Sequence, residues 1–234
     1  MSWTLEEAVA YYKKQGAPQD QTALINLLRE IQTESGGAIP AYGVTVMTND
    51  LQLNVDVTAQ GGRILWMMPE TAAFTQNLTL QQCIDAAADF LRRRGFGDAT
   101  AVTQQIYADG LCVITFAPLD GNIALYPDIL RLQVRMDTGD IVGFEAHEYW
   151  QNHTDRSLPA PTLTETSARA LLPDRLDANK GQLCLIPRGS TERLCWEYAV
   201  TYNHAEYRLY LDAFTGAELE IVKLVPLDGG ITSA

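Results

Sequence analysis

The order of apolar and polar residues along the chain follows two alternating periods. In the first forty residues apolar positions recur every three to four residues, as on one face of a helix. A first helix is predicted after Thr4, which forms a capping box with Glu7, and it ends at Gly16. A second helix is predicted to begin at Asp20, with apolar residues on one face at Leu24, Leu27, Leu28 and Ile31.

From residue 42 the period changes to two, which is typical of strands with one buried face. Strands are predicted over residues 42–46, 51–57 and 63–68, with turn signals at Asn49-Asp50 and Gly61-Gly62 between them. The first part of the chain is therefore predicted to place helices before a meander of three strands.

The same order of elements returns twice. A capping box at Thr79 and Gln82 opens a helix that ends before Gly95. Strands are predicted after it over residues 102–108, 111–117, 130–137 and 140–149. A last helix is predicted from Thr164 to Leu172, because Pro173 cannot continue it. Its strands are predicted over residues 182–187, 193–202, 206–212 and 217–225.

Three glycines of predicted hairpin turns lie at equal spacing. Gly62, Gly139 and Gly216 are separated by two steps of 77 residues, which indicates a repeated unit. The expected fold class is α+β, with tandem units that each pack a helix on a separate three- to four-stranded antiparallel sheet. The expected division is 1–70, 71–157 and 158–234, where the first range holds the N-terminal helices and a partial first unit.

Composition and charge narrow the range of partners. The chain has 234 residues, of which 47% are hydrophobic, so it can bury a sizeable core. Its net charge of -12 repels nucleic acid and anionic membranes, so neither is expected as a partner. No apolar run approaches the roughly 20 residues that cross a bilayer, and Glu6 and Glu7 argue against a secretion signal. We therefore expect an intracellular protein.

The residues that most often carry chemistry do not form a recognisable pattern. Four cysteines are spread widely without a CxxC motif and are expected to be free thiols: Cys83, Cys112, Cys184 and Cys195. His147 and His153 are six residues apart, whereas a zinc-binding helix needs them four apart. His204 is expected in a loop. No catalytic, metal-binding or cofactor-binding residue is therefore assigned.

Two other features are candidates for binding. The second half is rich in aromatic residues, most of which are expected in the core while the rest line a partner-binding groove: Tyr149, Trp150, Trp196, Tyr198, Tyr202, Tyr207 and Tyr210. Strand edges left open between the units are the second candidate, because an open edge accepts a partner's strand.

The chain resembles a known family in several motifs that occur in the same order. They are "YPD" at 126–128, "GDIVGFEAHEYWQNHTDR" at 139–156, "LIP" at 185–187, "LCWEY" at 194–198 and "DAFTGAELEI" at 212–221, and "VDVTAQGGRILWMM" at 55–68 looks like the end of a first repeat. The family is that of the spore germination protein YpeB from endospore-forming Firmicutes, with its C-terminal PepSY-type repeats. The resemblance covers about residues 42–232.

This resemblance implies PepSY-like units and a forespore-associated protein without enzymatic activity. It implies a protein partner, such as a spore cortex-lytic hydrolase or peptidase, that is held, stabilised or inhibited. The chain is expected to depart from the family at its start, where two helices are predicted in place of the usual membrane anchor. Residues 23–40 are also similar to the helical start of the thioredoxin-like component of NADH dehydrogenases, but the cysteine spacing does not fit the iron cluster of that component.

Two alternatives to a binding protein remain from the sequence. One is a hydrolase with an acidic and aromatic cleft between repeats, which would bring Glu145, Glu197 and the three histidines into one pocket. The other is a soluble vegetative paralogue with a different partner. The sequence does not distinguish inhibition from stabilisation of the partner, and it does not fix the oligomeric state.

Overall fold

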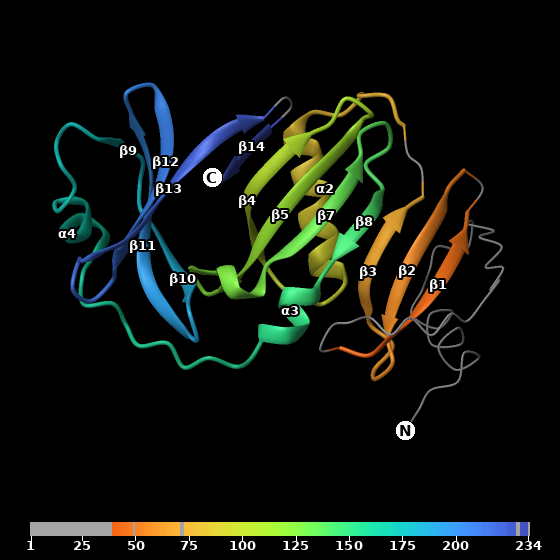
Figure 1. Ribbon diagram of the computed structural model, residues 1–234, viewed down its shortest axis with the longest axis horizontal. Helices are drawn as coiled ribbons and strands as arrows, with labels where there is room; N and C mark the ends of the chain where they lie inside the picture. Colours follow the sequence, from red (N-terminus) through yellow and green to blue (C-terminus); the bar gives the residue numbers. More distant parts are fainter. Residues whose placement is uncertain (1–38, 49, 71–72, 228–229, 234) are drawn as a thin grey trace.

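The computed structural model describes residues 39–48, 50–70, 73–227 and 230–233 (Figure 1). The two predicted N-terminal helices lie outside these residues. None of the described helices is long and apolar enough to cross a membrane.

Strands dominate the described part of the chain, and the mixed α and β composition agrees with the prediction. The first three strands, β1 (Ala41–Met47), β2 (Gln52–Thr58) and β3 (Ile64–Pro69), form an antiparallel meander. The middle of the chain holds β4 (Ala99–Ile106), β5 (Leu111–Asp120), β6 (Ile123–Leu125), β7 (Leu130–Arg135) and β8 (Ile141–Glu145). The last part holds β9 (Asp177–Ala178), β10 (Gln182–Arg188), β11 (Thr191–Tyr202), β12 (Ala205–Asp212), β13 (Glu218–Leu227) and β14 (Gly230–Ser233).

The longest described helix, α2 (Leu80–Arg93), forms as its sequence predicts. The Thr79 side chain accepts a hydrogen bond from the Gln82 backbone, and the Gln82 side chain accepts one from the Thr79 backbone, which completes the capping box. The helix buries Cys83, Ala87 and Leu91 against one face of β4, β5, β7 and β8 (Figure 1). The sheet therefore has one face covered by α2.

Three shorter helical segments differ from the prediction. The helix predicted over 164–172 is α4 (Glu165–Arg169), because Leu171 and Leu172 continue it only with tighter i to i−3 hydrogen bonds. The strand predicted over 140–149 ends at Glu145 and is followed by α3 (His147–Asn152). Helix α3 places the rings of Tyr149 and Trp150 against the ring of Phe96. The alternation of apolar and polar residues did not indicate this contact. A 3-10 turn, η1 (Tyr126–Asp128), follows β6.

The same hairpin geometry occurs three times, in β2–β3, β7–β8 and β12–β13, which we call the repeated hairpins. Each turn is closed by a backbone hydrogen bond of 2.8–3.0 Å, from Thr58 to Arg63, Arg135 to Asp140 and Asp212 to Ala217. The turn glycines, Gly62, Gly139 and Gly216, all have positive φ. The ladder shifts register between residues 56 and 57, 133 and 134, and 210 and 211. All these features recur at the predicted step of 77 residues, so the repeat extends to details of the backbone.

The expectation of a separate sheet for each unit is wrong. The strands of the described residues form one continuous 14-stranded sheet, joined at three places that we call the joints. In the described residues β3 pairs with β8 at residues 66–67 and 144–145, β14 pairs with β4 only at Gly230 and Gln105, and β6 pairs in parallel with β10 at residues 124–125 and 184–185. An open strand edge tends to pair with another strand. At the joints, the strand edges of neighbouring parts of the chain pair with one another.

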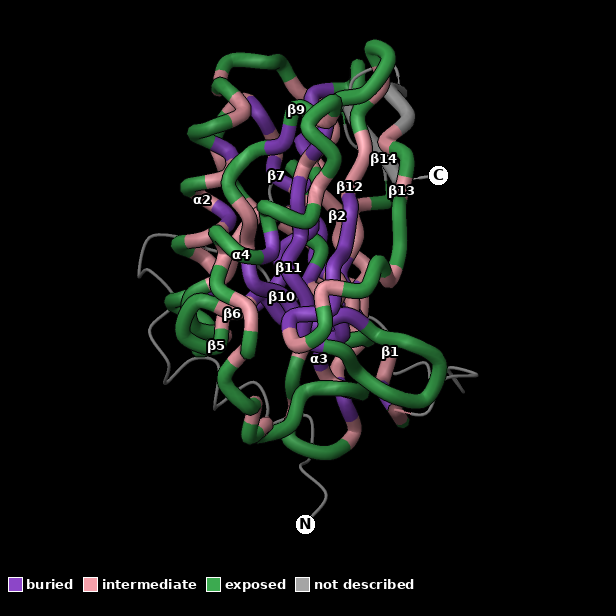
Figure 2. The backbone as a smooth tube through the Cα atoms, turned by 90° about the vertical axis from the view of Figure 1, so that its left-hand side faces the viewer, coloured by how far each residue is buried: buried purple, intermediate pink, exposed green. Residues whose placement is uncertain are grey.

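The apolar core of the described residues is divided into three clusters. Figure 2 shows that the buried segments follow strands through the middle of the molecule, β10 and β11 among them. The largest lies under α2 and includes Val55 and Met67 from the first meander. A second lies beside α4 and around β10–β12. The third lies between the middle and last parts of the chain, where Ala117 and Ala124 meet Cys184, Ile186 and Tyr210. The joints are therefore reinforced by shared apolar cores.

Gly110, in the turn between β4 and β5, lies against the backbone of Phe74 in the segment before α2. A Cβ atom at Gly110 would lie 2.1 Å from the carbonyl oxygen of Phe74, and the φ of Gly110 is +79°. We predict that Gly110→Ala lowers the free energy of unfolding by more than about 2 kcal/mol. Gly121→Ala, at a positive φ of +60° with open space around it, should cost only about 1 kcal/mol. Urea unfolding measures both, and equal costs would contradict the close contact at Phe74.

Candidate functional site

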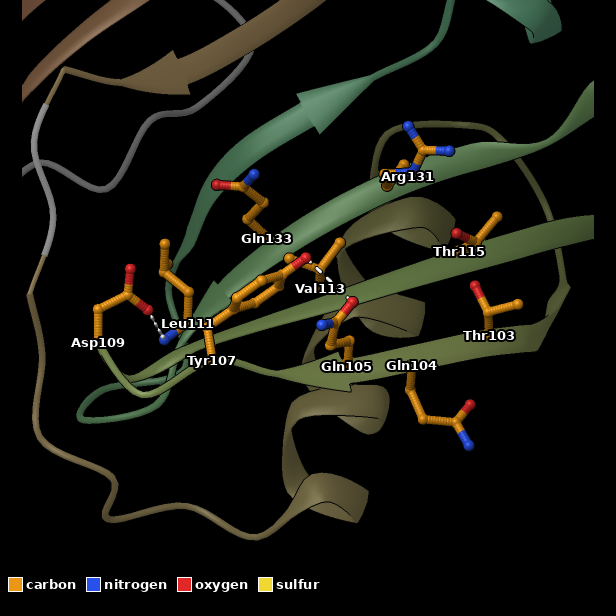
Figure 3. Close-up of a pocket in the computed structure, with 10 residues that line it drawn as sticks. All are labelled: Thr103, Gln104, Gln105, Tyr107, Asp109, Leu111, Val113, Thr115, Arg131 and Gln133. Atoms are coloured by element: carbon orange, nitrogen blue, oxygen red, sulfur yellow. Dashed lines mark hydrogen bonds between the residues drawn. The ribbon is translucent and has the colours of Figure 1, made fainter. Parts of the chain in front are cut away.

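A groove lies on the face of the sheet opposite α2, over β4, β5 and β7 (Figure 3). Side chains of a strand alternate between faces, so Cys112, Ile114 and Phe116 of β5 point to α2 while Leu111, Val113 and Thr115 point to the groove. Its volume is about 450 Å³. The lining residues are Thr103, Gln104, Gln105, Tyr107, Asp109, Leu111, Val113, Thr115, Arg131 and Gln133.

The groove combines an apolar floor with polar side chains that are mostly uncharged. The Tyr107 hydroxyl donates a hydrogen bond of 3.0 Å to the Gln105 side chain, as Figure 3 shows. Arg131 forms an ion pair of 2.9 Å with Glu145, and Asp109 accepts a hydrogen bond from the Leu111 backbone. The groove is therefore suited to binding through hydrogen bonds and apolar contact. The side chains of Tyr107, Arg131 and Asp109 each already have a hydrogen-bond or ion-pair partner within the chain.

Gln133 occupies an unusual position in the groove. Its side-chain oxygen is buried and has no hydrogen-bond partner in the structure. The side chain lies over Gly143 of the neighbouring strand β8, where a Cβ atom would come within 2.6 Å of it. A buried acceptor without a donor costs about 1–3 kcal/mol. Gly143 therefore makes room for a side chain whose polar oxygen is left unsatisfied.

The two glutamates considered for hydrolysis are engaged in different networks. Glu145 on β8 pairs with Arg131, and His147 lies 3.8 Å from it. Glu197 on β11 is only 3% exposed, forms an ion pair with Arg208 and accepts a hydrogen bond of 2.5 Å from the Tyr126 hydroxyl. Burial and the charge of Glu197 raise the pKa of Tyr126. Both carboxylates thus have close partners within the fold.

The histidines are placed apart from these glutamates, except for His147. His153 lies 2.7 Å from the buried carboxylate of Asp128 and stacks on Tyr149. His204 lies in the turn between β11 and β12 with a positive φ of 61°. No group of three or more histidine, cysteine or acidic residues in the described chain is arranged to hold a metal ion.

The four cysteines are free thiols, as predicted, and all four are buried. Burial raises the pKa of the Cys112 thiol to about 12. Cys184 and Cys195 face each other across β10 and β11 with their sulfur atoms 3.5 Å apart, and both their hydrogen bond and burial raise the pKa of Cys184. These thiols behave as small apolar residues of the core.

Most aromatic residues of the second half are core residues, in agreement with the prediction. Those that are buried are Tyr149, Trp196, Tyr198 and Tyr210. Tyr202 is 39% exposed, and Tyr207 is partly buried against the core beside α4. The exposed tyrosine at the groove is Tyr107, in the middle of the chain, which the sequence interpretation did not single out.

A buried ion pair holds the segment after α3 against η1. Asp128 is fully buried and receives two hydrogen bonds of 2.7 and 2.8 Å from Arg156, whose side chain is 7% exposed. Arg156 also pairs with Glu192, near the start of β11, at 2.7 Å. This second ion pair connects the middle and last parts of the chain. Asp128 belongs to the "YPD" motif, and Arg156 is the last residue of the motif at 139–156. The sequence did not indicate that these two residues form an ion pair.

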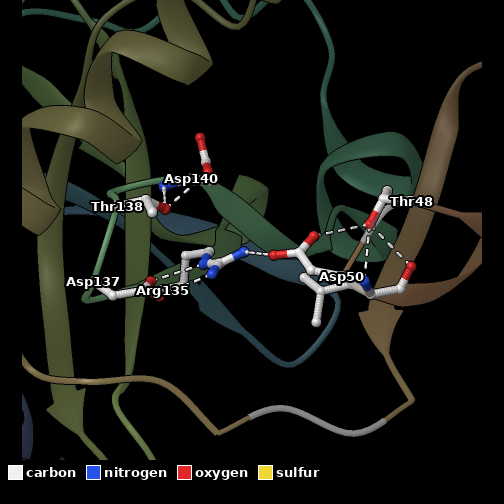
Figure 4. Close-up of polar contacts among 7 residues, drawn as sticks. Thr48, Asp50, Arg135, Asp137, Thr138 and Asp140 are labelled. Carbon is white, nitrogen blue, oxygen red and sulfur yellow. Dashed lines mark hydrogen bonds and ion pairs between the residues drawn. The ribbon is translucent and has the colours of Figure 1, made fainter. Parts of the chain in front are cut away.

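A second charged cluster connects the first and middle parts of the chain (Figure 4). Arg135, at the end of β7, donates two hydrogen bonds to Asp137 and one of 2.7 Å to Asp50 in the β1–β2 turn. The guanidinium also lies 4.4 Å from the centre of the Phe74 ring. Hydrogen bonds from Arg135 hold the pKa of Asp50 and of Asp137 below the usual range.

Repeated antiparallel hairpins and a long covering helix place the chain in the class of sheet-rich α+β proteins. Its fold is similar to that of the solved Bacillus megaterium YpeB C-terminal domain, with a TM-score of 0.78 and 21% identity over 96% of this chain and 99% of that one. The family model for YpeB sporulation, PepSY1 and PepSY2 domains, matches residues 14–159. The chain belongs to the YpeB sporulation protein family.

Curated relatives support this assignment. The chain is 33% identical over 197 residues to the sporulation protein YpeB of Halalkalibacterium halodurans. The matched region covers 83% of this chain and 44% of the relative. The chain is 28% identical over 172 residues to the sporulation protein YpeB of Bacillus subtilis strain 168, covering 73% of this chain and 38% of the relative. The chain thus spans less than half the length of these relatives.

The buried ion pair predicts a large effect of one substitution. We expect Arg156→Met to lower the free energy of unfolding by about 3–5 kcal/mol, because it leaves the carboxylate of Asp128 buried without its guanidinium. The matched control is Arg188→Met, which breaks the half-exposed pair with Glu220 and should cost less than about 1 kcal/mol. Thermal or urea unfolding measures both. Similar losses for the two variants would show that Asp128 does not depend on Arg156.

The Arg135 cluster predicts a dependence of stability on pH. The pKa values of Asp50 and Asp137 are lower in the folded chain, so their stabilisation is present above the unfolded pKa of about 3.9 and is lost as the pH falls through the folded values. Arg135→Met should therefore cost about 1 kcal/mol at neutral pH and less in acid.

Unfolding temperatures at several pH values measure this difference. The control is Arg175→Met, which removes a guanidinium lying over the Tyr202 ring and should cost the same at each pH. If the effect of Arg135→Met stays constant from neutral pH to about pH 2, the cluster does not contribute through these carboxylates.

Proposed function

We propose that this chain is a non-catalytic binding and regulatory protein of spore germination. In this proposal it holds a spore cortex-lytic hydrolase or peptidase and stabilises or inhibits it. The observation that carries the proposal is membership in the YpeB sporulation family with PepSY domains. The chain would act in association with the forespore and would need no metal or cofactor.

The proposed organisation is three PepSY-like units, over residues 1–70, 71–157 and 158–234. The three repeated hairpins with the same turn bond and register shift support this division. A covering helix is described for the second and third units, as α2 and α4. The units would form one body, because the joints and the shared cores connect them. Such a body offers a large surface of fixed shape to a protein partner.

The competing proposal, a hydrolase, requires an acidic and aromatic cleft between the units. The space between β5–β6 and β10–β13 is instead occupied by the apolar cluster that includes Ala117, Cys184 and Tyr210. Glu197 is buried at this place and paired with Arg208 and Tyr126. These contacts favour a structural role for Glu197 over a catalytic one.

Affinity purification tests the proposed function. We expect the tagged chain, expressed in sporulating cells, to retain a cortex-lytic hydrolase or peptidase that a tagged acidic protein of similar net charge does not retain. Addition of the purified chain should then change the rate at which this hydrolase releases soluble fragments from cortex.

Two results would overturn the proposal. The first is that no hydrolase or peptidase is retained although the chain is abundant. The second is that the chain by itself releases fragments from cortex, which would establish the enzyme instead.

A further inference from the structure

Cys184 and Cys195 form a pair of facing thiols in the last part of the chain. They lie directly opposite each other in the ladder of β10 and β11, with their sulfur atoms 3.5 Å apart. Directly opposite residues of an antiparallel ladder have Cα atoms about 4.5–5.5 Å apart, and a disulfide bridges Cα atoms about 4.4–6.8 Å apart. The ladder therefore places both cysteines where a disulfide can join them.

The connection between these two cysteines is short and local. Arg188 and Thr191 pair at the end of the hairpin, so Gly189 and Ser190 alone form its turn. Hairpins of this kind form within about 1–10 μs, whereas contacts between distant parts of a chain form more slowly. We therefore expect the two thiols to meet early in folding, while both are still exposed to solvent.

Burial determines when this pair reacts. Neither Cys184 nor Cys195 has exposed surface in the folded chain. The hydrogen bond to Cys195, burial and the neighbouring carboxylate of Glu197 raise the pKa of Cys184. Since the thiolate is the species that attacks a disulfide, the folded dithiol is unreactive. A disulfide that has formed before burial is shielded from reductants for the same reason.

The other two cysteines meet in a different way. Cys83 lies on α2 and Cys112 on β5, and both are buried in the core under the helix. They approach each other only when α2 packs on the sheet, and this packing also removes them from solvent. We therefore expect oxidation during folding at the hairpin pair and not at Cys83 and Cys112.

The facing thiols lie beside the joint between the middle and last parts of the chain. Cys184 is also opposite Ala124 in the parallel pairing of β6 with β10. Both cysteines belong to the apolar cluster to which the middle part contributes Ala117 and Ala124. A bond between the two sulfur atoms would therefore fix β11 to the strand that forms this joint.

We infer that Cys184 and Cys195 are a disulfide-forming site, which closes when the chain folds in the presence of a small-molecule disulfide and then stabilises the hairpin at the joint. In a reducing environment the chain folds as the dithiol. This site is separate from the proposed retention of a protein partner and does not depend on it.

Two exchange steps with oxidised glutathione form the bond. In the first step the thiolate of one cysteine attacks a glutathione sulfur and displaces one glutathione thiolate. In the second step the thiolate of the other cysteine attacks the cysteine sulfur of this mixed disulfide and displaces the second glutathione thiolate. The two thiol protons of the protein pass through solvent to the two released glutathiones. The cysteine pair is oxidised by two electrons, and the glutathione disulfide is reduced by two.

Mass spectrometry of the refolded chain tests this inference. The chain is unfolded and reduced, freed of reductant and refolded with oxidised glutathione, and the remaining thiols are then blocked. Trypsin cleaves after lysine and arginine, so each cysteine lies in its own peptide: 64–92, 95–131, 181–188 and 194–208. We expect peptides 181–188 and 194–208 to be linked in most molecules, while the other two carry blocked thiols.

The same oxidant added to the folded, reduced chain tests the role of burial. The link should then form more than about tenfold more slowly than during refolding, because the thiols must first be exposed by local opening. Dithiothreitol should likewise reduce the linked chain faster in urea than under folding conditions.

Stability measurements show what the bond does. Closing the loop between Cys184 and Cys195 should lower the equilibrium constant for unfolding roughly 100-fold, seen as a higher urea midpoint for the linked chain. Cys195→Ala should unfold at the same urea concentration after refolding with oxidised or reduced glutathione. The matched control, Cys83→Ala, should keep both the link and the difference in midpoint. Far-ultraviolet circular dichroism establishes that each variant is folded.

Three outcomes contradict the inference, and the first two need no variant. One is that all four thiols are blocked after refolding with oxidised glutathione. Another is that most molecules carry a link between any other two of the four peptides. The third is that the linked chain unfolds at the same or a lower urea concentration than the dithiol chain, so that the bond does not stabilise the hairpin.

Discussion

Backbone pairing at the edges of the strands is the constraint on which the rest of this structure depends. A three- or four-stranded unit has two open edges, and unpaired edges recruit other strands. Here β3 pairs with β8, β14 with β4 and β6 with β10, so that neighbouring parts of the chain pair at each joint. Each joint has only one or two pairs of strand residues among the described residues. The shared apolar cores add side-chain packing between the same parts of the chain.

The same arrangement determines which surfaces remain for binding. The joints take up edges that would otherwise accept a partner's strand, and α2 covers one face of the middle strands. The opposite face keeps its polar side chains and forms the groove. Charged clusters at Arg135 and Arg156 hold consecutive parts of the chain together. A regulatory protein built in this way would present surfaces fixed by the sheet, with little rearrangement on binding.

The sequence predicted the features that depend on local pattern. The capping box at Thr79, the strands of period two and the spacing of the turn glycines all appear in the structure. It did not predict α3, because alternation of apolar and polar residues continues through His147 and Tyr149 although the chain turns there. It also did not predict the continuous sheet, since pairing between distant strands leaves no local signal.

The candidate site was less predictable than the fold. Gln133 lies in β7 and Tyr107 directly follows β4, in stretches of ordinary composition. They reach one groove only because their neighbouring strands pair in the sheet. The pairing of Asp128 with Arg156 crosses 28 residues, and nothing in either motif identifies its partner. The aromatic residues that the sequence made prominent are mostly in the core, because large apolar side chains are buried first.

We conclude that the three repeated hairpins belong to a single body, connected through the joints and the shared apolar cores. The indole N–H groups of Trp150, which donates to Ile64, and of Trp196, which donates to Leu163, report on the first joint and on the last part of the chain. Unfolding in urea can be followed by nuclear magnetic resonance of these two indole N–H groups. If the chain is a single body, both native signals disappear at the same urea concentration; clearly separate midpoints would show that the parts unfold independently.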